Sequence, residues 1–160
     1  MKQLINNAVV AVTGTDASIF AAKYAIVLAK LYQCKLTAVY VVDTATIKQL
    51  TLSKIFIQEE SAEYEKNLEN NGERYLTFVE ELARSKDVKI ERILRKGAIY
   101  TEILGVADEK KADLILLGGW EKDTKTRDII GHSHREIMAN AKCSVMIVKE
   151  PDIDQIYKKI

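Results

Sequence analysis

The chain has few of the residue patterns that mark whole classes of protein. Its 160 residues include only two cysteines, Cys34 and Cys143, which lie far apart and form no CxxC pair. Such sparse cysteines indicate free thiols in a cytoplasmic protein rather than disulfides or a metal framework. No apolar run is long enough to cross a bilayer, and the N-terminal residues lack the long apolar region and cleavage site of a signal peptide. We therefore expect a cytoplasmic protein with no membrane segment.

An excess of charge of one sign is also missing. Lys and Arg number 24, Asp and Glu number 23, and the formal net charge is +1. Strong non-specific binding to nucleic acid requires concentrated positive charge, so we expect no nucleic-acid partner. A small anionic ligand held in one local pocket is compatible with this balance.

Motifs of the common catalytic sites do not occur. The sequence has no Walker P-loop, no Ser-His-Asp arrangement and no paired carboxylates in a glycine-lined turn. Ser133 stands between His132 and His134, but adjacent residues at a helix start usually point apart, so a nucleophile with its base is not expected there. The two histidines alone are a weak metal signal, because a metal site needs further ligands. We expect no catalytic residues and no metal ligands.

Five short segments rich in Val, Ile and Leu are present, with helical patterns between them. The expected strands cover residues 8–12, 36–42, 88–94, 113–118 and 144–148. Four of them are almost continuously apolar, as strands covered on both faces are. The third is more mixed, which suggests an edge strand. The alternation predicts an α/β fold: a doubly wound, open five-stranded parallel sheet of Rossmann-like type, with helices on both faces.

Apolar residues recur at helical spacing over residues 16–32, 71–86 and 98–112, with Thr15 or Asp16 as the N-cap of the first helix. The charged run before the second of these helices, residues 59–75, is typical of a solvated helix face.

The last helix has an apparent start signal. Ser133 and Glu136 fit the S-x-x-E capping box, which predicts that this helix begins at Ser133.

Two further segments complete the chain. Residues 44–60 form a longer connection with enough apolar residues to pack or to cover a pocket. We expect one domain over residues 1–150 and a helical tail over residues 151–160.

The glycines after two of the strands indicate a binding crevice. Ligands of open α/β sheets bind beyond the carboxyl ends of the strands, where the strand order reverses. If the first and fourth strands are neighbours, their turns meet at one crevice, where glycine lets the backbone approach a ligand closely. The candidate residues on these turns are Thr13, Gly14, Thr15, Gly118 and Gly119. A helix start behind Gly131 would add free N–H groups and a positive dipole end for a phosphate. The same pattern also fits a well-capped helix with no ligand.

Residues 9–43 and 112–149 resemble the opening and closing halves of the universal stress protein family. The first stretch, VVAVTGTDASIFAAKYAIVLAKLYQCKLTAVYVVD, is similar to that family's first strand, helix and second strand. The second, ADLILLGGWEKDTKTRDIIGHSHREIMANAKCSVMIVK, is similar to its closing half. The resemblance implies a five-stranded parallel sheet and a homodimer formed through the last strand.

ATP-binding members of that family carry G-x-x-G, nine further residues, and then G-S or G-T. Gly118 and Gly131 match the first and third glycines of this motif, whereas Glu121 replaces the middle glycine and His132 replaces the Ser or Thr. Ser133, or a protonated His132, would substitute for the missing hydroxyl. The acidic Glu121 would weaken the binding of a triphosphate, so the resemblance implies AMP as readily as ATP, with Mg²⁺ only if ATP is bound.

Two further positions carry over from the family. Thr13 stands where the family has an aspartate at the end of the first strand, and the backbone at Val41 matches the position that meets the adenine. The resemblance thus implies a regulatory protein that binds an adenine nucleotide. Two alternatives stay open: a nucleotide-free dimeric adaptor, and a weak ATPase or autophosphorylating protein. The residues implied for nucleotide binding are Thr13, Gly14, Thr15, Val41, Gly118, Gly119, Gly131, His132 and Ser133.

Overall fold

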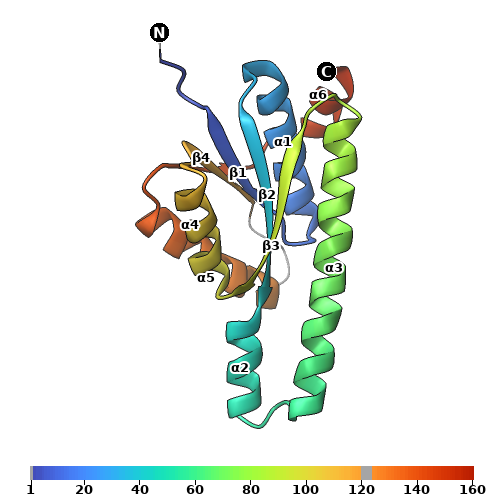
Figure 1. Cartoon of the computed structure of the whole chain (residues 1–160), viewed down its shortest axis with the longest axis vertical. Helices are drawn as coiled ribbons and strands as arrows, with labels where there is room; N and C mark the ends of the chain where they lie inside the picture. Colours follow the sequence, from blue (N-terminus) through green and yellow to red (C-terminus); the bar gives the residue numbers. More distant parts are fainter. Residues whose placement is uncertain (1, 120–123) are drawn as a thin grey trace.

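The computed structural model describes residues 2–119 and 124–160, without the side chains of residues 124–130. Along the chain, the elements are β1 (Asn7–Ala11), α1 (Asp16–Tyr32), β2 (Lys35–Asp43), α2 (Thr44–Leu52), α3 (Gln58–Arg84), β3 (Ile90–Gly97), α4 (Ile99–Glu109), β4 (Leu114–Gly118), α5 (Thr124–Asn140), β5 (Ser144–Val148) and α6 (Ile153–Lys159). Figure 1 shows the sheet between its two groups of helices, with α2 and part of α3 extending beyond one end of the sheet.

Within the described residues, five parallel strands form one sheet in the order β3-β2-β1-β4-β5. The chain winds outward from β1 in one direction and then returns to place β4 on the other side of β1. This order confirms the predicted doubly wound fold and the edge position of β3. The first and fourth strands are neighbours, which was the condition for their turns to meet at one crevice. The strand order therefore reverses between β1 and β4, at the place where such folds bind ligands.

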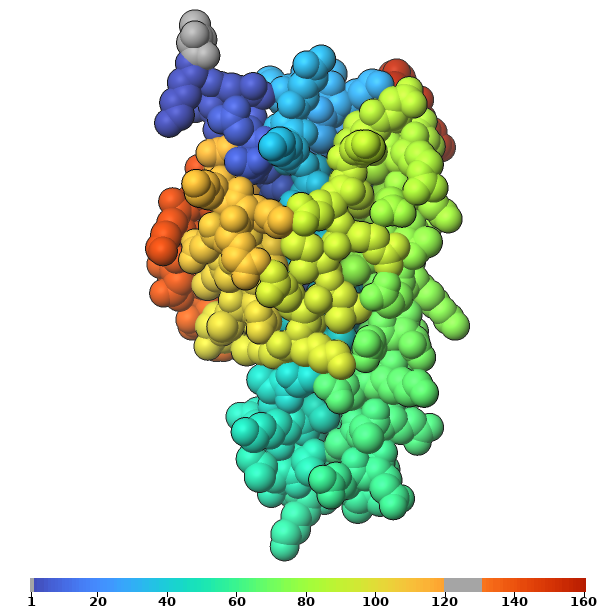
Figure 2. Space-filling model, in the orientation of Figure 1, coloured from blue at the N-terminus to red at the C-terminus, as the bar shows by residue number. Residues whose placement is uncertain are grey.

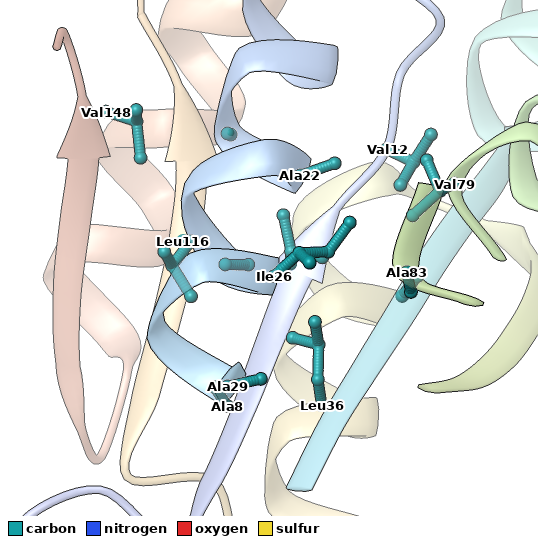
Figure 3. Close-up of a cluster of buried hydrophobic side chains, with 14 of the residues drawn as sticks. Ala8, Val12, Ala22, Ile26, Ala29, Leu36, Val79, Ala83, Leu116 and Val148 are labelled. Atoms are coloured by element: carbon teal, nitrogen blue, oxygen red, sulfur yellow. The ribbon is translucent and has the colours of Figure 1, made fainter. Parts of the chain in front are cut away.

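Each face of the sheet packs against its own helices. One face carries α1, α3 and α6, and the other carries α4 and α5. The alanines of α1, which include the fully buried Ala21, Ala22 and Ala25, let this helix lie close to β1 and β4. Figure 3 shows Ala22 and Ile26 of α1 lying over the sheet near Leu116 of β4. Burial of this apolar surface, at about 25 cal/mol per Å², is the main source of stability.

A carboxylate at the start of β4 fixes this strand beside β1. One oxygen of Asp113, Oδ2, accepts hydrogen bonds from the backbone N–H groups of Asn6 and Asn7, at 2.8 and 2.9 Å. The backbone N–H of Asp113 in turn donates to the carbonyl of Asn7 at 2.8 Å. The two backbone donors lower the pKa of Asp113, because they stabilise the ionised form. The two strands consequently begin in step, and their carboxyl ends lie side by side.

Two contacts between tyrosines and glycines place α3 on the sheet. Tyr40 of β2 packs against Gly72, where a Cβ would stand 2.4 Å from the Tyr40 Cδ1 atom. Tyr75 of α3 packs against Gly14, which has a φ of +80°. The Tyr40 and Tyr75 rings also stack, with centroids 6.3 Å apart. Since Tyr40 is buried, its ring has little room to move away from a larger side chain at position 72.

The connection over residues 44–60 contains a helix that the sequence pattern did not indicate. Asp43 caps α2, because its side chain accepts hydrogen bonds from both the N–H and the hydroxyl of Thr46. After α2 the chain turns back, so that α3 packs along α2. The hydroxyls of Thr51 and Ser61 form a hydrogen bond of 2.5 Å between the two helices. This hairpin, α2 with the first half of α3, stands out from the rest of the molecule in Figure 2. The solvated helix face predicted over 59–75 belongs to it.

The edge strand β3 is covered by ion pairs along its length. Glu73 of α3 pairs with Arg92, Glu109 of α4 pairs with Arg95, and Lys110 pairs with Glu91; Lys96 pairs with Glu69. Each pair is largely exposed and contributes little to stability by itself. Their common effect is to place charged side chains on both faces of the edge strand.

The tail forms a helix against the body of the protein. Ile153 and Tyr157 of α6 are buried in the core that α1 and α3 share. The Tyr157 hydroxyl donates to the carbonyl of Leu82 at 2.7 Å, and Lys23 of α1 forms an ion pair with Asp154 at 2.5 Å. None of the helices in the described part of the chain has the length and apolar composition that crossing a bilayer requires.

The two mid-helix glycines give a matched test of the contact between α3 and the sheet. Replacing Gly72→Ala forces a Cβ against the buried Tyr40 ring, so we expect the free energy of unfolding to fall by about 1–3 kcal/mol. Gly105→Ala in α4 meets no atom within 4 Å, so we expect a gain of up to about 1 kcal/mol from helix propensity. Urea unfolding of the two variants measures both values. A stabilised Gly72→Ala variant would contradict the packing described here.

Candidate functional site

Three adjoining hollows lie at the carboxyl end of the sheet, and all three are bordered by Ile99. The slot, of about 170 Å³, lies over the end of β2 between α3 and α4. The inner hollow, of about 40 Å³, lies between the ends of β1 and β4 beside the start of α1. The outer hollow, of about 270 Å³, lies between the first turns of α2 and α4 and the side of α5.

The slot exists because β2 continues past the end of β1. The last paired residues of these strands are Ala11 and Val39, whereas β2 and β3 remain paired as far as Asp43 and Gly97. The N–H of Val12 donates to the carbonyl of Val39 at 2.8 Å, on the side of β2 that faces β1. Peptide groups of every second residue in a strand point to the same side. The N–H and C=O of Val41 therefore face the slot, at a level that β1 no longer reaches.

The walls of the slot are largely apolar. Tyr64 and Leu68 of α3 stand on one side, and Ile99 and Ile103 of α4 stand on the other. A flat apolar ring with polar groups along one edge suits such a space, because the walls contact its faces while the backbone of Val41 meets its edge.

The first turn supplies hydroxyl groups at the mouth of these hollows. Thr15 is the N-cap of α1, since its side chain accepts from the N–H of Ser18 at 3.1 Å, which decides between the two candidates Thr15 and Asp16. The Thr13 and Thr15 hydroxyls lie 3.0 Å apart, and Thr13 is exposed. Thr13 borders both the slot and the inner hollow, so its hydroxyl is accessible to anything bound in either.

The glycines of the two turns are needed for packing within the protein. A Cβ on Gly118 would lie 2.7 Å from the backbone carbon of Ala17 and 2.9 Å from the nitrogen of Ser18. A Cβ on Gly119 would lie 3.3 Å from the carbonyl oxygen of Val148, and Gly14 holds a positive φ beside Tyr75. Their lack of side chains lets β4, α1 and α3 approach one another, a reason for these glycines that involves no ligand.

The predicted start of the last helix at Ser133 is wrong. Helix α5 begins at Thr124, so Gly131, His132 and Ser133 lie inside it. Their backbone N–H groups are therefore not the free donors of a first turn. The side chains of His132 and Ser133 still border the hollows, whereas Gly131 borders none of the three. Glycine in a helix costs only about 1 kcal/mol, which the packing of α5 against α4 can offset. A capping-box pattern inside a helix looks the same in sequence as a true start.

The two histidines lie on different faces of α5. His132 is exposed and meets the Tyr100 ring edge-on, with ring centroids 5.8 Å apart. His134 is buried and borders the inner hollow, together with Ser133. Among the described residues, no group of three His, Cys, Asp or Glu side chains is arranged to hold a metal ion.

The cysteines have no place in this site. Cys34 and Cys143 are both free, and burial raises the pKa of each thiol. Cys34 precedes β2, at the opposite end of the sheet from the slot. A raised pKa keeps the thiol protonated at neutral pH, the unreactive form.

Some residues that follow Gly119 lie outside the described part of the structure. They include Trp120, Glu121 and Lys122, together with the side chains of Lys125, Arg127 and Asp128; Glu121 stands at the position of the middle glycine of the family motif.

The comparison with known proteins agrees with this fold. The family model for the universal stress protein family matches residues 5–149. The chain belongs to the universal stress protein family. A universal stress protein of Methanocaldococcus jannaschii is 33% identical over 150 residues, which cover 94% of this chain and 85% of the relative.

Solved universal stress proteins share the fold. One from Burkholderia pseudomallei superposes with a TM-score of 0.72 at 18% identity, over 94% of this chain and 100% of the other. A universal stress protein solved with cAMP gives 0.64 at 21% identity, over 90% and 96% of the two chains. The protein from Archaeoglobus fulgidus solved with dAMP gives 0.63 at 17% identity, over 92% and 100%.

Within this universal stress protein, the slot uses residues that the family motif does not name. Tyr64, Leu68 and Ile103 form its walls, yet in the sequence they are only apolar positions of helices. The sequence did carry one signal for the slot, the greater length of β2 (KLTAVYVVD) compared with β1 (NAVVA). A strand that extends beyond its neighbour leaves some of its peptide groups without a strand partner.

Gly118 offers a test that separates packing from binding. We expect Gly118→Ala to lower the free energy of unfolding in the absence of any ligand, by about 1–3 kcal/mol, because its Cβ meets backbone atoms of α1 that cannot rotate away. Thermal unfolding of the ligand-free protein measures this loss. Unchanged stability would show that the close approach of α1 and β4 is not needed for folding.

Proposed function

We propose that this universal stress protein is a regulatory module that binds an adenine nucleotide, with the base in the slot. The observation that carries the proposal is the backbone of Val41, whose N–H and C=O face the slot beyond the last residue pair of β1 and β2. Adenine presents a donor and acceptors along one edge and two apolar faces. The slot offers a matching peptide edge between two apolar walls.

Relatives of the same fold support this proposal. One was solved with cAMP and another with dAMP, so adenine monophosphates bind universal stress proteins whose sheets superpose on this one. The position of the slot at the carboxyl end of the sheet, next to the reversal of strand order, is also the usual place for a ligand in this class of fold.

The space for phosphate favours a short ligand. The inner hollow, at about 40 Å³, has room for roughly three water molecules, so a chain of phosphates would extend beyond it. The outer hollow is larger and is bordered by His132, Ser133 and Gln49, so the proposal directs a phosphate there. The N–H and hydroxyl of Thr46, at the edge of this hollow, already donate to Asp43. AMP is the preferred ligand on this reasoning, and Mg²⁺ would enter only with ATP. Thr13, at the junction of slot and inner hollow, would meet the ribose.

The proposal also includes a homodimer and a cytoplasmic location. Strand β5 is the second edge of the sheet, and its central residues, Val145 to Ile147, are only partly buried. A second copy pairing along β5 would cover them. Two free thiols are consistent with a reducing compartment.

Ligand titration tests the nucleotide. We expect AMP at a hundred times its Kd to raise the melting temperature by about 5–10 °C, because binding to the folded state stabilises it. Ribose 5-phosphate, which lacks the base, should leave the melting temperature unchanged. Ile99→Trp, which places an indole where the three hollows meet, should weaken AMP binding by more than about ten-fold. No shift with millimolar AMP or ATP would favour the nucleotide-free adaptor.

Sedimentation equilibrium tests the dimer. We expect a species of twice the 18.1 kDa chain mass at micromolar concentration. A mass of 18.1 kDa over the whole concentration range would remove the dimer from the proposal and leave the nucleotide site unaffected.

A further inference from the structure

One wall of the slot comes from the projecting hairpin rather than from the body of the protein. Tyr64 lies in the second turn of α3, in the half of this helix that packs with α2 and extends past the sheet. It borders the slot together with Val41 and Ile103, although it is far from both in sequence. The hairpin is therefore part of the site as well as an extension of the fold.

The ring of Tyr64 is only partly covered by protein. Its exposure is 44%, whereas the other aromatic ring bordering the slot, that of Tyr40, is buried. Burial raises the pKa of Tyr40, with smaller contributions from the nearby Tyr75 and Tyr64 hydroxyls. Tyr64 thus stands beside the stacked pair Tyr40 and Tyr75 and borders the slot as a half-exposed ring.

We infer that Tyr64 is a binding residue that stacks on the base of the nucleotide. The inference rests on the proposed function. Ile99 and Ile103 on α4 contact one face of the base, and the Tyr64 ring on α3 contacts the other. Stacking on an aromatic side chain is a substantial part of the affinity of proteins for bases and tolerates differences among them. Specificity for adenine then comes from the backbone of Val41, and Tyr64 contributes affinity for a flat base.

The same residue connects the slot to the tip of the hairpin. The rings of Tyr64 and Phe56 are in contact, with centroids 5.5 Å apart and planes at 59°. Phe56 belongs to the turn between α2 and α3, and its backbone N–H donates to the carbonyl of Leu50 at 3.2 Å, as that of Ile55 does at 2.9 Å. A base that holds the Tyr64 ring in place also restrains its neighbour Phe56. Occupation of the slot should therefore slow opening of this turn.

Affinity measurements on variants test the stacking role. Tyr64→Ala should weaken AMP binding by about ten-fold, while Tyr64→Phe should stay within about two-fold of the wild type, because the ring and not the hydroxyl makes the contact. Phe78→Ala is the matched control: Phe78 is an aromatic residue of the same helix with the same 44% exposure, and it does not border the slot. It should bind AMP as the wild type does. Calorimetry with AMP and with ribose 5-phosphate gives the part of the binding free energy that depends on the base.

Hydrogen exchange gives a second readout that a purely structural tyrosine would not change. Saturating AMP should increase protection of the Ile55 and Phe56 amides in the wild type and should not do so in Tyr64→Ala. Equal AMP affinity of the wild type and Tyr64→Ala would overturn the inference and leave the proposed function intact. A wild-type protein that binds neither AMP nor ATP would overturn both.

Discussion

The unequal length of two neighbouring strands is the constraint on which the site depends. β1 ends at Ala11, whereas β2 continues to Asp43 because β3 pairs with it along that whole stretch. Beyond the end of β1, β2 stays extended because it is still paired with β3. Its peptide groups on the β1 side have no neighbouring strand to hydrogen-bond there. Backbone groups in that position need a partner. In this protein they face a space with apolar walls.

The glycines near the site are required for close packing between elements of the fold. Gly118 permits the first turn of α1 to lie against β4, and Gly14 accommodates the ring of Tyr75. Gly72 does the same for Tyr40 on the other side of the contact between α3 and the sheet. A glycine pattern resembling a phosphate loop thus marks positions where elements approach closely, and the approach of the elements is what shapes the hollows. Loss of binding after changing such a glycine would not by itself identify a ligand contact.

Much of the fold could be predicted from the sequence, because buried parallel strands are short and continuously apolar. The strand segments and the mixed edge strand were evident from local pattern, and the first N-cap was narrowed to Thr15 or Asp16. The start of α5 was not, because Ser133 and Glu136 look like a capping box whether or not the helix has already begun. The position of Tyr64 in the wall of the slot could not be predicted either, because it depends on how far α3 extends along α2. Features that depend on local sequence were predictable. Features that depend on contacts between elements far apart in the chain were not.

The charged pairs along β3 have a consequence for how copies of this chain can associate. Arg92 and Lys96 pair with carboxylates of α3 on one face of the sheet, and Arg95 pairs with a carboxylate of α4 on the other. Charged side chains along an edge strand disfavour hydrogen bonding to a foreign strand. At the opposite edge, β5 takes part in none of the ion pairs of the described residues. A sheet with one edge free to pair can join a single further copy, edge to edge about a two-fold axis, and it then has no free edge left. Ion pairs that contribute little to folding thereby disfavour open-ended association through β3.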